Sequence, residues 1–163
     1  MSLLEMCQWI ENTPLGTGIR EGLWWFPLLN LAHLLAMAVS AGTIAFVDLR
    51  LLGLGMKRVP VSQVAGQLLP WTWAGFVVLF VSGSLLIVSE AVLLYGNWAF
   101  RVKVVLLLAA GLNVLIFHRT VYRNVAVWDQ AAVTPLRARI AGGVSLACWV
   151  GLIAAGRTIP YLE

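Results

Sequence analysis

The stretch that decides the fold is residues 23–47, LWWFPLLNLAHLLAMAVSAGTIAFV, which contains no Asp, Glu, Lys or Arg. A hydrocarbon core of about 30 Å needs roughly 20 apolar helical residues, so this run is long enough to cross a bilayer as a helix. Three further runs in the chain are also long and apolar. The four predicted spans cover residues 23–47, 71–95, 99–118 and 135–156.

The composition of the whole chain favours the same class of protein. Of its 163 residues, 61% are hydrophobic and 11% are charged, whereas soluble domains carry about 25% charged residues. We therefore predict an all-α integral membrane protein, with one antiparallel four-helix bundle over residues 1–163. Ser2 and Glu5 match a capping box, which predicts a short N-terminal interfacial helix before the first span.

The net charge of +4 is distributed unevenly between the two sides of the predicted spans. Seven of the 11 Lys and Arg residues fall in or beside the first and third connections, and four fall on the other side. Cytoplasmic loops carry the excess of Lys and Arg, so both termini are predicted to lie outside the cytoplasm. The positive charge is then a topology signal, and the expected partner is the lipid bilayer instead of nucleic acid.

Local patterns mark the ends and contacts of the spans. Trp71 and Trp73 are predicted to lie at a span end, where aromatic belts occur, and Thr134 with Pro135 is predicted to cap the last helix. Small residues recur at every fourth position of two spans, and such stripes mark close helix contacts, within one bundle or across a homodimer. The stripes are Ala32, Ala36 and Ser40 in the first span and Gly143, Ala147, Gly151 and Ala155 in the last.

His33 is the most informative polar residue. It lies about ten residues into the first span, roughly 15 Å deep, where ionisable groups are costly and functional by default. Met37 follows one helical turn later; imidazole with thioether suits Cu(I), and imidazole alone suits copper or haem iron. Asn30 and Ser40 share this face and are predicted to orient the ring. The alternative is a structural histidine that is hydrogen-bonded to a neighbouring helix.

His118, the second of two histidines, ends the third span beside Arg119. This position predicts a site near the cytoplasmic interface, about 10 Å or more from the depth of His33. The two side chains are therefore not expected to ligate one iron within a protomer. His118 stays a candidate axial ligand of haem b. The second axial ligand would then be another residue, or the site would be completed by the second chain of a dimer.

Other polar residues lie near the outer end or at membrane depth. Glu90 precedes Arg101 and Lys103 across a short turn, which predicts either a surface ion pair or an outward-facing entry site for a cation or proton. Asn113 and Ser82 are predicted to form interhelical hydrogen bonds or to support His33. In the first connection, Asp48 and Arg50 are predicted to pair or to cap the first span.

Four blocks of sequence resemble a known group of proteins. They are WIENTPLGTGIREGLWWFP (residues 9–27), VDLRLLGLG (47–55), LLPWTWAGFVVLFVSG (68–83) and YGNWAFRVKVVLLLAAGLNVLIFHR (95–119). Over nearly the whole chain, they resemble a family of small bacterial inner-membrane proteins of unknown function.

More distantly, the layout is similar to the four-helix unit of the copper resistance protein D (CopD) family. That unit has a histidine in its first helix, a glycine in its second, a Tyr-Gly…Lys start to its third, and often an asparagine further along the third. The resemblance implies copper handling across the inner membrane. The matching residues here are His33, Gly83, Tyr95, Gly96, Lys103 and Asn113.

Three functions are consistent with these residues. The leading hypothesis is an inner-membrane protein with a His33-centred metal or redox site linked to copper handling, its cofactor being copper or haem b. The second is a small b-type cytochrome that passes electrons to or from quinone through His33 or His118. The third is a structural or assembly subunit with no cofactor. No motif for hydrolysis or phosphoryl transfer is present, and enzyme activity stays an open question.

Overall fold

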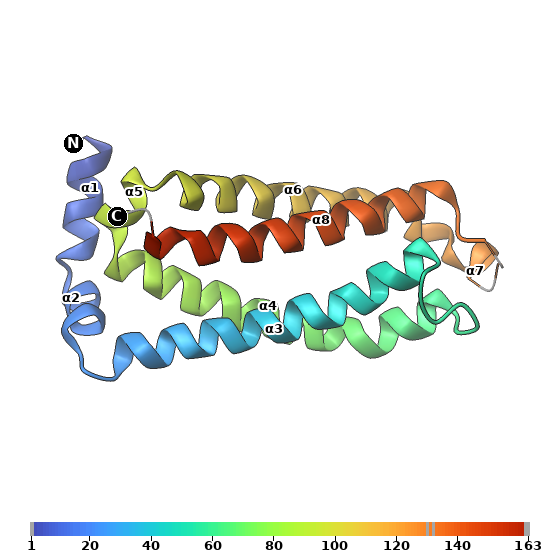
Figure 1. Cartoon of the computed structure of the whole chain (residues 1–163), viewed down its shortest axis with the longest axis horizontal. Helices are drawn as coiled ribbons and strands as arrows, with labels where there is room; N and C mark the ends of the chain where they lie inside the picture. Colours follow the sequence, from blue (N-terminus) through green and yellow to red (C-terminus); the bar gives the residue numbers. More distant parts are fainter. Residues whose placement is uncertain (1, 130, 132, 162–163) are drawn as a thin grey trace.

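The structure is a computed structural model, and it describes residues 2–129, 131 and 133–161. These residues form helices and no strand, which confirms the all-α class. Four long helices lie side by side and alternate in direction along the chain (Figure 1). Each belongs to a helical stretch that is long and apolar enough to cross a membrane. The four are α3 (Trp25–Leu52), α4 (Val61–Ser89), α6 (Trp98–Thr120) and α8 (Leu136–Thr158).

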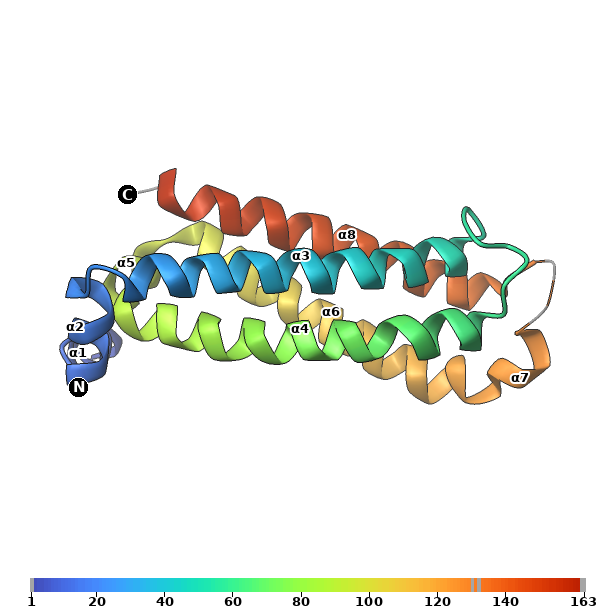
Figure 2. The same cartoon turned by 90° about the horizontal axis from the view of Figure 1, so that it is seen from below.

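The long helices pack in pairs. α3 packs against α4, α6 packs against α8, and α3 also contacts α8, so α3 and α8 join the two pairs (Figure 2). α1 and α2 lie across one end, the α1 end, and α7 lies at the opposite end, the α7 end (Figure 1). The remaining elements are α1 (Leu3–Glu11), α2 (Pro14–Glu21), α5 (Ala91–Gly96), η1 (Tyr122–Asn124), α7 (Val125–Trp128) and η2 (Ile159–Tyr161).

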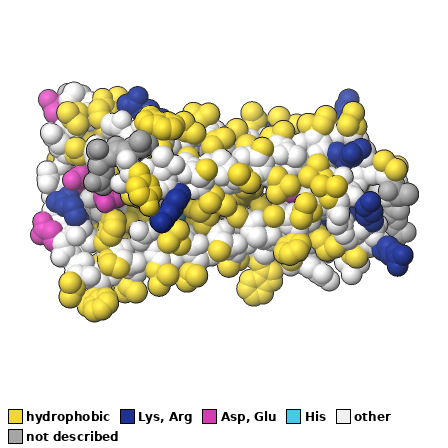
Figure 3. Space-filling view, in the orientation of Figure 1, with side chains coloured by type: hydrophobic (Ala, Val, Ile, Leu, Met, Phe, Trp, Pro, Cys, Tyr) yellow, Lys and Arg dark blue, Asp and Glu magenta, His cyan; other side chains and the backbone are white. Residues whose placement is uncertain are grey.

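The surface divides into an apolar middle and two charged ends. On the face in Figure 3, Lys and Arg gather at the α7 end, while acidic and basic side chains mix at the α1 end. Large apolar side chains along the helices face outward, including Phe80 and Leu108, which are 68% and 69% exposed. Contiguous apolar surface of this kind is rare on soluble monomers and is normal where lipid covers it.

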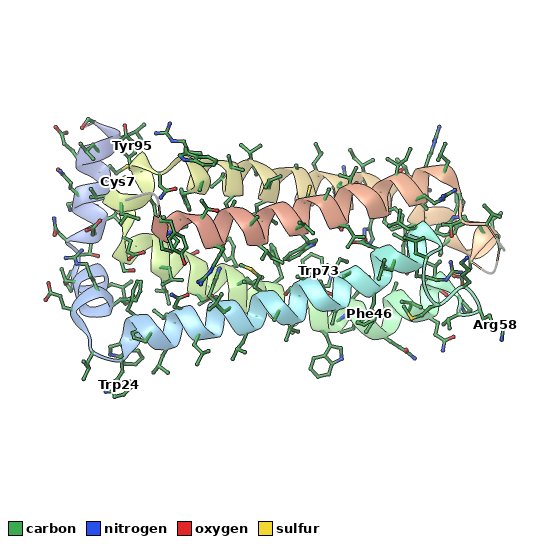
Figure 4. All side chains as sticks on the ribbon, in the orientation of Figure 1. Cys7, Trp24, Phe46, Arg58, Trp73 and Tyr95 are labelled. Carbon is green, nitrogen blue, oxygen red and sulfur yellow. The ribbon has the colours of Figure 1, made fainter. Side chains whose placement is uncertain are left out.

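The helices extend beyond the predicted spans. α3 continues past residue 47 until Gly53, whose φ of 74° ends it in the left-handed conformation. α4 begins at Val61, ten residues before the predicted start, and runs unbroken through Pro70. Trp71 and Trp73 therefore lie about 15–18 Å inside the helix, and their position at a membrane edge stays a prediction. Figure 4 labels Trp73 near the middle of the long helices.

The N-terminal capping box is confirmed. The Ser2 N–H donates to Glu5 Oε2 at 2.8 Å, and the Glu5 N–H donates to Ser2 Oγ at 3.2 Å. The expected short helix α1 follows. A second short helix, α2, was missed by the sequence analysis, although Thr13 caps it and Pro14 occupies its first turn, which is a common start signal.

Glu11 holds this N-terminal layer against the long helices. Its Oε1 accepts from Arg20 Nη1 at 2.9 Å, and its Oε2 accepts from the Val92 N–H at 2.8 Å. The Val92 N–H belongs to the first turn of α5, where backbone donors have no helical partner. Gly16 allows a close approach of α2, since a Cβ there would lie 3.0 Å from Val88 O. The layer is therefore fixed across the α1 end.

The small-residue stripe of the first span is confirmed as a helix contact. Ala36 and Ser40 are buried against α4, where Gly75 faces them. A Cβ on Gly75 would lie 3.1 Å from Ala36 O and would overlap Ser40 Oγ. Ser40 Oγ donates to Thr72 O at 3.2 Å, and the hydroxyls of Thr43 and Thr72 are 2.8 Å apart. The α3–α4 seam thus combines near-backbone contact with interhelical hydrogen bonds.

In α8 the buried face is offset from the predicted stripe. Gly151 contacts α6 of the same chain, since a Cβ there would lie 2.8 Å from Leu106 Cδ1. Ala155 is buried, but Ala147 is exposed. A homodimer through this stripe stays a prediction. The buried residues of α8 are Ala138, Gly142, Ser145, Cys148, Leu152 and Ala155.

A buried arginine organises the α7 end. Arg50 is 3% exposed, and it donates from Nε to Val59 O at 2.7 Å, from Nη1 to Thr134 Oγ1 at 3.4 Å and from Nη2 to Asp129 O at 3.5 Å. The predicted pairing with Asp48 is not found among the described residues, because positions i and i+2 lie on different sides of a helix. The predicted cap by Thr134 is wrong, since α8 has no side-chain cap and Thr134 binds Arg50.

Asp129 caps the N-terminus of α4 from across the α7 end. Its Oδ1 accepts from the Ser62 N–H at 2.8 Å, and its Oδ2 accepts from Ser62 Oγ. Burial alone would raise the pKa of the Asp129 carboxyl, but the Ser62 hydrogen bonds and the nearby Arg50 cation hold this pKa below its usual range. A carboxylate at this position also matches the positive end of the helix dipole.

Asp129→Ala is expected to lower the stability of the protein at neutral pH by about 1 kcal/mol, the usual value of a helix cap. Because the pKa of Asp129 is depressed in the folded state, this stabilisation is present above the ordinary aspartate pKa and is lost as the pH falls through the folded value. Thermal unfolding in detergent, from neutral to acidic pH, measures the difference between the two proteins. The difference should shrink on acidification; a difference independent of pH would contradict the ionised cap.

Candidate functional site

His33 lies on α3 and points to α4, where Ser82 sets its protonation. His33 Nδ1 lies 2.9 Å from Ser82 Oγ, and Ser82 Oγ lies 2.6 Å from Val78 O. A carbonyl can only accept, so the single hydroxyl proton of Ser82 goes to Val78 O. Ser82 Oγ then accepts from the ring, which places the proton of the neutral imidazole on Nδ1. His33 Nε2 is therefore the nitrogen with the free lone pair.

Gly83 allows the imidazole to approach the backbone of α4. A Cβ at this position would lie 3.1 Å from His33 Cε1 and 3.6 Å from His33 Nδ1. Any larger side chain would therefore displace the ring from Ser82. The carbonyl of Leu79, also on α4, lies near the imidazole.

Lys103 of α6 completes the surroundings of His33. Its ammonium group is close enough to act electrostatically on the imidazole. Gly156 of α8 gives the lysine room, because a Cβ there would lie 3.5 Å from Lys103 Nζ. All four long helices thus contribute residues near the α1 end. His33, Gly83 and Lys103, which the CopD resemblance places on three separate helices, come together here.

The other residues predicted around His33 have different surroundings. Met37 is half-buried, one turn along α3 from His33. Asn30 is exposed, and the hydroxyl of Ser40 donates to the Thr72 carbonyl. The hydrogen bond that orients the imidazole comes from Ser82 instead, which confirms the interhelical hydrogen bond predicted for Ser82.

His118 lies far from His33. α3 and α6 run in the same direction (Figure 1), and His33 is eight residues from the start of α3 while His118 is twenty from the start of α6. At 1.5 Å per residue, they differ by about 18 Å along the helix axis. The His118 ring is exposed, donates from Nδ1 to Val114 O at 3.0 Å and contacts Phe117 and Tyr122. One chain does not bring the two histidines into a single site.

Glu90 follows Gly83 by seven residues, and Asn113 follows Lys103 by ten. Glu90 occupies the junction between α4 and α5, at the α1 end. Arg101, one of its predicted partners, donates to Tyr95 O at 3.0 Å. Asn113 Nδ2 donates to Ala141 O at 2.9 Å, which confirms an interhelical hydrogen bond between α6 and α8.

A shallow apolar groove runs along the outside of the α3–α4 seam. It has a volume of about 270 Å³ and includes Ser82 in its lining. The hydrogen-bond partner of His33 thus also lines this outward-facing apolar groove. The other lining residues are Leu29, Ala32, Val77, Val78 and Val81.

A metal bound to His33 would need further ligands other than His, Cys, Asp or Glu side chains. In the part of the chain that the structure describes, no three His, Cys, Asp or Glu side chains are grouped so that they could hold a metal ion. The nearest soft donor in sequence is the Met37 thioether, whereas a porphyrin would bring its own equatorial ligands. On α3, the donors that remain for a metal are therefore the His33 imidazole and the Met37 thioether.

A family model described as a family of unknown function (DUF6644) matches residues 7–162. No curated protein and no solved structure matches the chain. The matched range includes all four long helices and every residue around His33.

Proposed function

The chain belongs to this family of unknown function (DUF6644), and we propose that it is an inner-membrane protein in which His33 ligates a metal or metal cofactor. Four long apolar helices support a transmembrane four-helix bundle. The basic α7 end supports a cytoplasmic location for that end and an external location for both termini. A metal or redox site linked to copper handling is the function that these features support best.

The hydrogen bond between His33 Nδ1 and Ser82 Oγ is the observation that carries this proposal. Histidines that bind metals almost always donate their second ring N–H to an oxygen atom, which fixes the ring and its tautomer. His33 does so through Nδ1 to Ser82, whose proton is in turn fixed by Val78 O. The ring is held by this hydrogen bond, and Nε2 is left unprotonated. These are the properties that a metal ligand needs.

Copper is the first candidate metal. The thioether of Met37 is a soft ligand suitable for Cu(I), and it follows His33 by one helical turn. Both side chains are half-buried. The resemblance to the CopD family adds copper handling as an independent reason for this choice.

Haem b is the second candidate, and the position of Lys103 favours it. A lysine cation near His33 raises the energy of a bare metal cation at the same place. The same cation would stabilise a cofactor that carries carboxylates, as haem does. Bound haem would supply one-electron chemistry, and His33 would hold and orient it. This form of the proposal is a b-type cytochrome that exchanges electrons with quinone.

One preparation distinguishes these candidates. The protein is purified from membranes without chelator, and its copper and iron contents and its absorption spectrum are measured. Copper without a Soret band supports the copper site, and iron with a Soret band supports haem. If neither metal is present and His33→Gln remains folded and functional, the proposal fails and a structural subunit without cofactor is the correct function.

Met37→Leu is expected to weaken copper binding at least about tenfold and to leave haem content unchanged. Leucine conserves the volume of methionine, so the fold should be retained. Competition with a Cu(I) chelator measures the affinity. Met6→Leu, on the exposed side of α1, is the matched control. An unchanged copper affinity in Met37→Leu would exclude the thioether as a ligand.

A further inference from the structure

A second interior site lies near the other end of α3. Asp48 is only 3% exposed, and its Oδ2 is a buried oxygen without a hydrogen-bond partner among the described residues. The hydroxyl of Ser145, on α8, is within hydrogen-bonding reach of the same carboxyl. Half of the hydrogen-bonding capacity of this side chain is therefore unused inside the protein, which is a costly arrangement.

The backbone around Asp48 is closely packed against α8. A Cβ on Gly142 would lie 3.0 Å from Asp48 O and 3.6 Å from Asp48 Cα. Gly142 and Ser145 both belong to the buried face of α8. The carboxyl is thus enclosed on this side by helix backbone and by one hydroxyl.

No ion pair to Asp48 is found in the part of the chain that the structure describes. Arg50, two residues away, donates to oxygens of the loops at the α7 end. The sequences of α4 and α7 contain no charged residue. The charged or titratable groups of α8 and α6 nearest to this end are exposed: Arg137 and Arg139 on α8, and His118 and Arg119 on α6.

We propose that Asp48 is a proton-binding site within the membrane, with a carboxyl that is protonated at neutral pH. A carboxylate buried in apolar surroundings without a cation is far less stable than the neutral acid. Protonation also gives the carboxyl a donor of its own. Ionisable residues that face the interior of membrane helices are typical of proton-handling sites.

The position of Asp48 defines the source of the proton. Asp48 is four residues from the end of α3, about 6 Å, so the aqueous phase at the α7 end is the nearer one. His33 is fifteen residues away on the same helix, about 22 Å. The Asp48 site therefore does not depend on any metal at His33, and the two proposals can fail separately.

The chain allows an unambiguous test, because Asp48 and Asp129 are its only aspartates. Protein labelled with carbon-13 in the aspartate side-chain carboxyl is reconstituted in lipid vesicles, and its two carboxyl signals are followed by solid-state NMR during a pH titration. Asp129→Asn removes one signal and thereby identifies the other as that of Asp48.

The Asp48 signal is expected at the position of a protonated acid at neutral pH, and it should move to the carboxylate position only in alkaline buffer. The Asp129 signal should be that of a carboxylate at neutral pH. An Asp48 signal at the carboxylate position at neutral pH would overturn the proposal. The proposal would also be overturned, in favour of a metal-cation site, if the Asp48 carboxyl is protonated at neutral pH in potassium buffer but becomes ionised when sodium replaces potassium.

Discussion

His33→Ala is expected to leave the purified protein without its metal or haem while the four long helices remain folded. His33 is the only histidine on α3, and His118 lies about 18 Å away along the helix axis. No other described histidine can therefore replace it within one chain. Metal content and the absorption spectrum measure the loss, which should be essentially complete.

Two further variants separate ligation from general damage. His118→Ala removes an exposed ring whose hydrogen bond goes to Val114 of its own helix, so metal content should be unchanged. Ser82→Ala retains the ligand but removes the oxygen that fixes its tautomer, which should weaken binding about 10- to 100-fold. Full metal content in His33→Ala would show that the cofactor binds elsewhere.

Gly75→Leu is expected to be strongly destabilising, because it separates α3 from α4. A Cβ at Gly75 already overlaps Ser40 Oγ and lies 3.1 Å from the Ala36 carbonyl, and helix backbone cannot rotate away as a side chain does. Overpacking of this kind usually costs about 1–3 kcal/mol. Gly75→Leu should also disturb His33, since the His33 ring contacts the same face of α4.

Gly111→Leu is the matched control for this substitution. Gly111 lies on α6, and a Cβ there would meet nothing within 4 Å. Thermal unfolding in detergent should therefore show a large fall in the midpoint for Gly75→Leu and a small change for Gly111→Leu. Equal changes in the two variants would mean that the α3–α4 seam is less closely packed than the structure shows.

The sequence was sufficient for the class of fold but not for the helix ends. Long apolar runs predicted the four helices, because hydrophobic length is a property of the chain itself. The start of α4 could not be found this way. Its first ten residues are less apolar than the span, and its N-terminus is capped by Asp129 from a distant part of the chain. Such a cap is visible only after folding.

For similar reasons, only part of the candidate site could be predicted from the sequence. The depth of His33 followed from residue counting, but the choice of Ser82 as its partner depends on the register between α3 and α4. The tautomer depends on the same register and on the Val78 carbonyl. That Asp48 is buried without Arg50 as its partner could have been predicted from the sequence. Residues two apart lie on different sides of a helix, and the predicted ion pair did not take this into account.

The most direct test of the His33 site uses the fact that the chain contains two histidines. In His118→Ala protein labelled with nitrogen-15 histidine, His33 is the only labelled imidazole. Pulsed EPR of the oxidised metal centre then reports whether that imidazole is bound to the metal. We predict a nitrogen-15 coupling of the size expected for a directly ligated ring nitrogen. A preparation without a metal centre, or a centre without histidine coupling, would contradict the proposed role of His33.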